Sequence, residues 1–231
     1  MADDRDFNRE LYPFLYAESD AGAAWSNDVR ADARDSTLRK CADIVALRRQ
    51  LSGEFTELVV DAAIAMARAF AGGGKLLAFG NGGSATDAQD AAVDCLSPPF
   101  SSWRSLPALA LNSDTGVVTG VANDVGFESV FSRQIIALGE SSDIALGFST
   151  SGSSPNVIAA FREAKRRGML CIALTGNDGG ELVRPGLVDY CFIARLEYIP
   201  RIQEGHATVW HALVEAAQTA LSEGLVEASP A

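Results

Sequence analysis

The sequence predicts a three-layer α/β/α domain, in which a five-stranded parallel sheet lies between two layers of helices and is preceded by N-terminal helices. Short apolar runs recur along the chain, and most of them are almost continuous in apolar residues. Stretches of helical length and composition separate these runs. Continuous apolar runs are typical of strands that are buried on both faces, as in a parallel sheet covered by helices.

The first third of the chain predicts an arm and then helices. Residues 1–36 are polar, rich in alanine and interrupted by Pro13, so we expect an N-terminal arm there and a single domain over residues 37–231. Apolar residues recur near helical spacing over residues 38–70, and Gly53 predicts a break between two helices. Their apolar faces need a partner, which is either the sheet or another subunit.

Strands and helices alternate after the three glycines at residues 72–74. Helical stretches separate the apolar runs, and helices are expected at residues 85–96, 156–167 and 202–225. Five strands are predicted, at residues 76–79, 106–111, 144–148, 170–174 and 190–193.

Composition excludes several classes of partner. The formal net charge of −11 over 231 residues argues against a nucleic-acid backbone as partner, because recognition of that kind needs clustered Lys and Arg. No apolar stretch approaches the roughly 18 residues of a membrane span, and the first ten residues have no signal-peptide pattern. The four cysteines are scattered and predict reduced thiols in the core. We therefore expect a cytoplasmic protein that binds neither nucleic acid nor membrane.

Two loops carry candidate chemistry, because ligands of open parallel sheets bind beyond the carboxyl ends of the strands. The first strand is followed by a glycine-rich loop that leads into a helix. This loop consists of Gly80, Asn81, Gly82, Gly83 and Ser84. Such a loop lets a backbone approach a ligand closely, but it is equally often a structural turn. It lacks the lysine of a P-loop and the glycine spacing of a dinucleotide site.

The second loop, residues 149–155, holds five hydroxyl side chains between a buried strand and a helix. One Ser or Thr would suffice to cap the helix, so a cap is the simpler interpretation. Five hydroxyls with free backbone N–H groups instead favour an uncharged cradle for phosphate, which suits an acidic protein.

Six short motifs stand out along the chain. They are GNGGS at 80–84, AND at 122–124, FSRQIIALG at 131–139, STSGSSPNV at 149–157, LTGNDGG at 174–180 and RIQEGHATVWH at 201–211. With these motifs the chain resembles the phosphoheptose isomerases, a branch of the sugar isomerase (SIS) fold. The resemblance covers about residues 40–221, and the motifs occur in the family's order and spacing.

The resemblance implies a homotetramer that converts sedoheptulose 7-phosphate to D-glycero-D-manno-heptose 7-phosphate. It also implies that phosphate lies in the hydroxyl loop. The substrate-binding positions that it implies are Asn81, Gly82, Gly83, Asn123, Asp124, Ser149, Thr150, Ser151, Ser154 and Gln203.

The metal and catalytic positions depart from the family. The family's His and Glu on the first helix of the sheet are Asp90 and Asp94 here, whereas Gln203 and His211 are retained. An acidic residue expected before the RIQE motif is Pro200. The implied divalent metal, zinc in the family, would then be held by Asp90, Asp94, Gln203 and His211. Because the carboxylate of Asp90 replaces a His ligand, manganese, magnesium or no ion at all are alternatives.

Helical geometry indicates which of these side chains can point toward one common site. Asp90 and Asp94 lie about 40° apart on one helix face, so they can converge on one ion, although a solvated acidic face explains them equally well. Gln203 lies about 80° from His211, whereas His206 lies about 140° from it. We expect His211 at the site and His206 packed elsewhere or at an interface.

Two functions remain open from the sequence. The first is an aldose–ketose isomerase that works through an enediol, with Asp94 as base and His211 as acid. The second is a non-catalytic phosphosugar-binding or protein-interaction SIS module. Retention of Gln203 and His211 favours the enzyme, and loss of the His and Glu pair favours the module.

Overall fold

A computed structural model describes residues 27–225 of the chain. Residues 1–26, which make up most of the predicted arm, lie outside the described residues. Contacts divide the chain into a first unit, Met1–Ala42, and a second unit, Asp43–Ala231. This division lies close to the predicted boundary after residue 36, which stays a prediction. All further description concerns the second unit unless stated.

Helix α3 (Asn27–Ala71) is continuous, so the predicted break at Gly53 is wrong. A glycine inside a helix costs only about 1 kcal/mol. Leu47 and Leu51 before it, and Met66 after it, are buried in the core and offset that cost. The predicted pair of N-terminal helices is therefore one helix.

The five predicted strands form one parallel sheet in the order β2-β1-β3-β4-β5. The second strand is shorter than predicted because it lies at the edge of the sheet and pairs only with β1. The strands are β1 (Leu76–Gly80), β2 (Ala108–Ala110), β3 (Ile144–Ser149), β4 (Leu170–Gly176) and β5 (Tyr190–Ala194).

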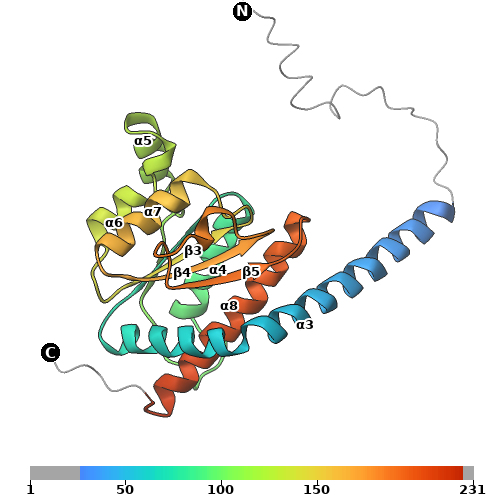
Figure 1. Cartoon of the computed structure of the whole chain (residues 1–231), viewed down its shortest axis with the longest axis horizontal. Coiled ribbons are helices and arrows are strands. Elements are labelled where there is room, and N and C mark those ends of the chain that lie inside the picture. The colour runs from blue at the N-terminus through green and yellow to red at the C-terminus, as the bar shows by residue number, and fades with distance from the viewer. Residues whose placement is uncertain (1–26, 226–231) are drawn as a thin grey trace, which may run out of the picture. The chain divides into compact units, whose positions relative to one another are not determined.

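Helices connect the strands and cover both faces of the sheet (Figure 1). The final helix begins three residues earlier than predicted, with Pro200 in its first turn. The helices are α4 (Gly83–Leu96), α5 (Thr115–Asp124), η1 (Phe127–Ser129), α6 (Ser132–Leu138), α7 (Pro155–Arg166), η2 (Gly180–Val183) and α8 (Ile199–Ser222).

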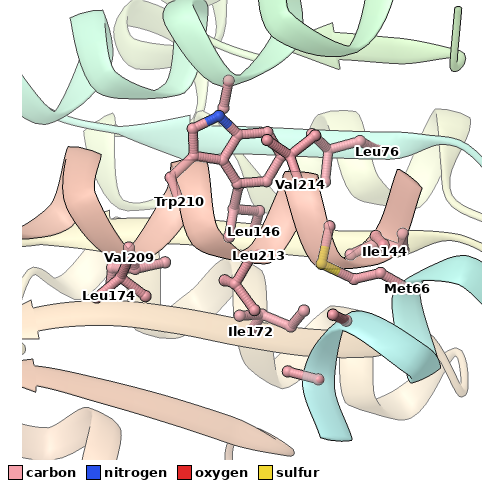
Figure 2. Packing of buried hydrophobic residues seen from close by; sticks show 14 of the residues in the cluster. Met66, Leu76, Ile144, Leu146, Ile172, Leu174, Val209, Trp210, Leu213 and Val214 are labelled. Atoms are coloured by element: carbon pink, nitrogen blue, oxygen red, sulfur yellow. The ribbon is translucent and has the colours of Figure 1, made fainter. Parts of the chain in front are cut away.

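Alternate residues of each strand point into two separate cores, as the period of two requires. On one face, Leu146 and Ile172 pack against α4, α8 and the second half of α3. Figure 2 shows this core, with Trp210 and Leu213 of α8 beside the strand residues. On the other face, Phe79 packs against α6 and α7. The prediction of a sheet covered on both faces is confirmed.

The cysteines are free thiols, but they are not all in the core. Cys95 and Cys171 are buried, Cys191 is half-buried and Cys41 is exposed. Among the described residues, none of the helices combines the length and the apolar character that crossing a bilayer requires.

Candidate functional site

The site lies where the strand order reverses. The chain passes from β1 to β2 on one side and then returns to β3 on the other, so the loops after β1 and β3 diverge at the carboxyl edge. Two reciprocal hydrogen bonds between Asn81 and Asn156 join these loops, with N···O distances of 2.8 and 2.9 Å. The structure thus brings together the two loops that the sequence singled out.

The hydroxyl loop is not an ordinary helix cap. Ser154 occupies the N-cap position of α7, yet its side chain makes no capping hydrogen bond. Its hydroxyl lies 3.1 Å from the hydroxyl of Ser149, which is 3% exposed. Thr150 is half-buried and Ser151 is exposed, with its Oγ accepting a hydrogen bond from the Ser153 N–H at 3.3 Å. The simple capping interpretation of this loop is therefore wrong.

A close approach of two backbones fixes the shape of this loop. Gly152 has a φ of +63°, and a Cβ at this position would lie 2.0 Å from the carbonyl oxygen of Gly179. The Leu182 N–H also donates to the Gly152 carbonyl at 3.1 Å. Because only glycine combines this φ with this contact, the hydroxyl loop is held rigidly against the loop after β4.

Gln203 reaches the glycine loop from the first turns of α8. A Cβ on Gly83 would lie 1.9 Å from the Gln203 Nε2, so the glutamine amide packs directly on this glycine. Gly82 is the N-cap of α4, with a φ of +57° and no side-chain cap. The structure thus places Asn81, Gly82, Gly83 and Gln203 in one region, at the start of α4.

Asp94 and His211 face one another from α4 and α8. His211 Nε2 lies 3.7 Å from Asp94 Oδ2, and their side chains are 67% and 27% exposed, respectively. Both line a cavity of about 210 Å³ whose other walls are mainly apolar. The remaining lining residues are Pro99, Phe100, Trp103, Val214 and Glu215.

Trp210 is a neighbour of this pair that sequence reasoning missed. Its indole Nε1–H donates to Asp94 Oδ2 at 2.8 Å, and the residue is 2% exposed. The sequence offered one signal, since Trp210 precedes His211 directly. The partner lies 116 residues away, however, so only the tertiary structure reveals the contact.

Asp90 does not complete a metal centre with these residues. It is exposed on α4, and the described residues contain no group of three or more His, Cys, Asp or Glu side chains that could hold an ion. Asp90, Asp94 and His211 are thus not assembled as three ligands within one chain. The predicted zinc, manganese or magnesium site does not fit the donors that a single chain brings together.

Asn123 and Asp124 stand apart from the two loops. Both are exposed at the end of α5, where the Asn123 Nδ2 donates to Asp124 Oδ1 at 2.8 Å. In the part of the chain that the structure describes, no hydrogen bond links them to the glycine loop or the hydroxyl loop. Helix α5 buries none of its own residues. A shared binding site of Asn123 and Asp124 with the two loops stays a prediction.

A second acid–histidine pair, with a buried histidine and a half-buried aspartate, lies between α4 and α8. His206 is 1% exposed, and its Nδ1 lies 3.9 Å from the Oδ2 of Asp87. Burial raises the pKa of Asp87 to about 7, helped by the negative charge of Asp90. Burial also lowers the pKa of His206 to about 4. His206 is packed in the interior, as its angular separation from His211 suggested.

A larger hollow, of about 580 Å³, lies at the opposite edge of the sheet. Its charged side chains are largely paired with one another, since Lys165 bonds Asp189 at 2.7 Å and Asp143 bonds Lys75 at 2.6 Å. We assign no function to this hollow, because none of the predicted site residues lines it.

Comparison with known proteins shows which proteins the chain is similar to in sequence and in fold. A family model described as SIS domain matches residues 41–176. A phosphoheptose isomerase of Thermodesulfovibrio yellowstonii is 42% identical over 192 residues, which are 83% of this chain and 94% of the relative. One from Burkholderia pseudomallei is 48% identical over 153 residues, 66% of this chain and 75% of the relative. The solved structure of phosphoheptose isomerase from Neisseria gonorrhoeae has a TM-score of 0.74 and 36% identity, and covers 81% of this chain and 99% of its own.

Proposed function

We propose, from the premise that the chain belongs to the phosphoheptose isomerase family of SIS-domain proteins, that it converts sedoheptulose 7-phosphate to D-glycero-D-manno-heptose 7-phosphate. The observation that carries the proposal is the pair of Asp94 and His211. Both side chains line one cavity, and His211 Nε2 lies 3.7 Å from Asp94 Oδ2. A carboxylate and an imidazole at this separation are suited to moving protons on neighbouring substrate atoms.

In this proposal the hydroxyl loop of a neighbouring subunit holds the phosphate, because Asp94 lies roughly 16 Å along α4 from Gly83 and the adjoining hydroxyl loop of its own chain. Ser149, Thr150, Ser151 and Ser154 offer hydroxyl groups at the start of α7, where free backbone N–H groups and the helix dipole favour an anion. Ser154 supports the assignment because its hydroxyl is not used as a helix cap. Asn81, Gly82, Gly83 and Gln203 are proposed to contact the sugar.

The chemistry is a proton transfer with no net oxidation. Asp94 takes a proton from C1 of the ketose, which gives an enediol, and returns it to C2 to form the aldose. His211 moves the accompanying proton between the two substrate oxygens through its ring nitrogen. The side chain of His211 is exposed enough to meet a substrate, and it is not locked to Asp94 by a hydrogen bond.

A divalent ion stays a prediction. Zinc is the ion that the family implies, and manganese or magnesium are alternatives for a carboxylate-rich set. Because no metal-binding cluster of three or more His, Cys, Asp or Glu side chains is present in residues 27–225, we route no step through an ion. Elemental analysis of the purified protein tests this prediction directly.

We also propose a homotetramer in which Asn123 and Asp124 serve the site of a neighbouring subunit. Both residues are exposed, and among the described residues no hydrogen bond links either of them to the glycine loop or the hydroxyl loop. These two observations support the arrangement. Large apolar side chains around α5, η1 and α6 are exposed, which a subunit interface would explain. They include Val117, Val125, Phe127, Ile136 and Leu138. A monomeric mass by light scattering at micromolar concentration would contradict the tetramer.

The decisive test is deuterium exchange into substrate. Incubation of sedoheptulose 7-phosphate in heavy water with the protein should give a deuterated sugar, and Asp94→Asn should abolish exchange without weakening phosphate binding. His211→Ala should act similarly through the acid. Absence of exchange by the unmodified protein with every divalent ion tried would contradict the isomerase.

A non-catalytic phosphosugar-binding module is the second candidate. Two observations favour the module. Asp90 and Asp94 replace the family's His and Glu, and residues 27–225 contain no three-ligand cluster. A module would bind sugar phosphate through the hydroxyl loop and show no exchange. The deuterium experiment, run beside a binding assay, therefore separates the two functions.

A further inference from the structure

We propose that Trp210 is a positioning residue, which holds the Asp94 carboxylate in place for proton transfer. This inference rests on the proposed isomerase function. Its basis is one contact, the 2.8 Å hydrogen bond from the indole Nε1–H to Asp94 Oδ2. The bond is charge-assisted, because the acceptor is a carboxylate.

The donor is fixed by the core. Trp210 is 2% exposed and belongs to the cluster between α8 and the sheet. Figure 2 shows its ring among Leu146, Leu213 and Val214, with the indole nitrogen turned away from the strand residues. A tryptophan packed in this way cannot change rotamer without opening a cavity, so its N–H points in one fixed direction.

The fixed N–H orients one oxygen of Asp94, and among the described residues no hydrogen bond engages the other oxygen. Asp94 Oδ2 accepts the indole bond and is also the oxygen 3.7 Å from His211 Nε2. A separation of 3.7 Å is too long for a hydrogen bond between these two atoms, so the imidazole stays available to a substrate oxygen. Asp94 Oδ1 is then the oxygen that takes the substrate proton.

The contact also offsets the shorter side chain. Aspartate ends one methylene short of the glutamate that the family resemblance implies at this position, and a displacement of about 1 Å at a reacting group can cost roughly a hundredfold in rate. A short carboxylate with a fixed donor on the facing helix is held in one orientation. Asp94 is shorter than the glutamate, and we infer that the fixed orientation given by Trp210 offsets this loss of length.

A structural role is the competing explanation, since a buried indole N–H needs an acceptor in any case. The two roles differ in what Trp210→Phe does. Phenylalanine keeps an aromatic ring in the core and removes the donor. If Trp210 positions the base, kcat for sedoheptulose 7-phosphate should fall by about tenfold to a hundredfold while KM changes less than about twofold. A purely structural role would lower thermal stability and leave kcat unchanged.

Leu213→Val is the matched control. Leu213 lies on the same helix and in the same core, and its side chain has no polar atom that could bind Asp94 or His211. It should lower the unfolding midpoint and leave kcat unchanged. If Leu213→Val reduces kcat as much as Trp210→Phe does, the effect comes from the core and the inference is wrong.

A double-mutant cycle tests whether Trp210 acts through Asp94. In an Asp94→Glu background the carboxylate moves out along a longer side chain and away from the indole. The tenfold to hundredfold loss caused by Trp210→Phe should therefore shrink to less than about threefold. An undiminished loss in that background would overturn the inference.

The hydrogen bond has a readout that needs no activity. In a nitrogen-15 NMR spectrum, the indole N–H signal that disappears in Trp210→Phe belongs to Trp210. Asp94→Ala should shift this signal and accelerate its exchange with water, and an unmoved signal would overturn the inference. If the unmodified protein catalyses exchange and Trp210→Phe is fully active, only this inference fails. If the unmodified protein is inactive, the proposed function fails and Trp210 loses its positioning role with it, even where the NMR experiment finds the bond.

Discussion

The pair of Asp87 and His206 should make two opposite contributions to stability that nearly cancel near neutral pH. The pKa of Asp87 is raised from 3.8 to about 7, chiefly by burial, so the folded state holds a proton that the unfolded state releases. Stability from this group is present at acid pH and is lost as pH rises toward 7. The pKa of His206 is lowered from 6.5 to about 4, so the unfolded state holds the extra proton. Stability from this group is present above 6.5 and is lost as pH falls.

Each contribution changes by about 2 kcal/mol between about pH 5 and about pH 7, because one pKa unit corresponds to about 1.4 kcal/mol. The value for Asp87 is an upper bound, since its side chain is 16% exposed and solvent screens part of the effect. A variant that lacks one of the two residues should show how the free energy of unfolding changes with pH because of the other residue alone. Asp87→Asn should gain stability relative to the parent as pH rises over this window, and His206→Gln should lose it.

The assay is urea unfolding of metal-free protein at about pH 5, 6 and 7, with the free energy of each variant taken relative to the parent at the same pH. This difference removes the titration of all other groups. We expect this free-energy difference to rise with pH for Asp87→Asn and to fall with pH for His206→Gln. Two profiles that run parallel to the parent would refute the reasoning, because they would show that neither group titrates differently in the folded state.

Three further predictions follow from single contacts. Ser154→Ala should weaken sugar-phosphate binding by about 1.5–3 kcal/mol in calorimetry, as loss of a bond to a charged group predicts, and unchanged binding would place the phosphate elsewhere. Asp143→Ala should destabilise the fold by about 3 kcal/mol in urea unfolding, because this buried carboxylate bonds the Lys75 ammonium at 2.6 Å and also accepts from two backbone N–H groups. A cost below about 1 kcal/mol would show that water replaces these bonds. Gly83→Ala should leave thermal stability nearly unchanged, because the flexible end of Gln203 can move aside, yet it should lower substrate affinity through that movement. Unchanged affinity would remove Gln203 from the binding site.

The sequence predicted the sheet and both ligand loops because their signals are local. Each strand is a short apolar run, and each loop follows such a run directly. The same local signals failed at Gly53, where helix propensity predicted a break. The burial of residues on either side of the glycine decides the helix there, and burial depends on the rest of the fold.

The site pairs were decided by the tertiary structure. The family resemblance named Asp94 and His211, but only the packing of α4 against α8 brings them within 3.7 Å. The same packing does not bring Asp90 into a three-ligand cluster among the described residues. It also joins Trp210 to Asp94 and buries His206 beside Asp87. Contacts between residues more than a hundred positions apart depend on how two helices pack on a sheet, and no local pattern in the sequence encodes that geometry.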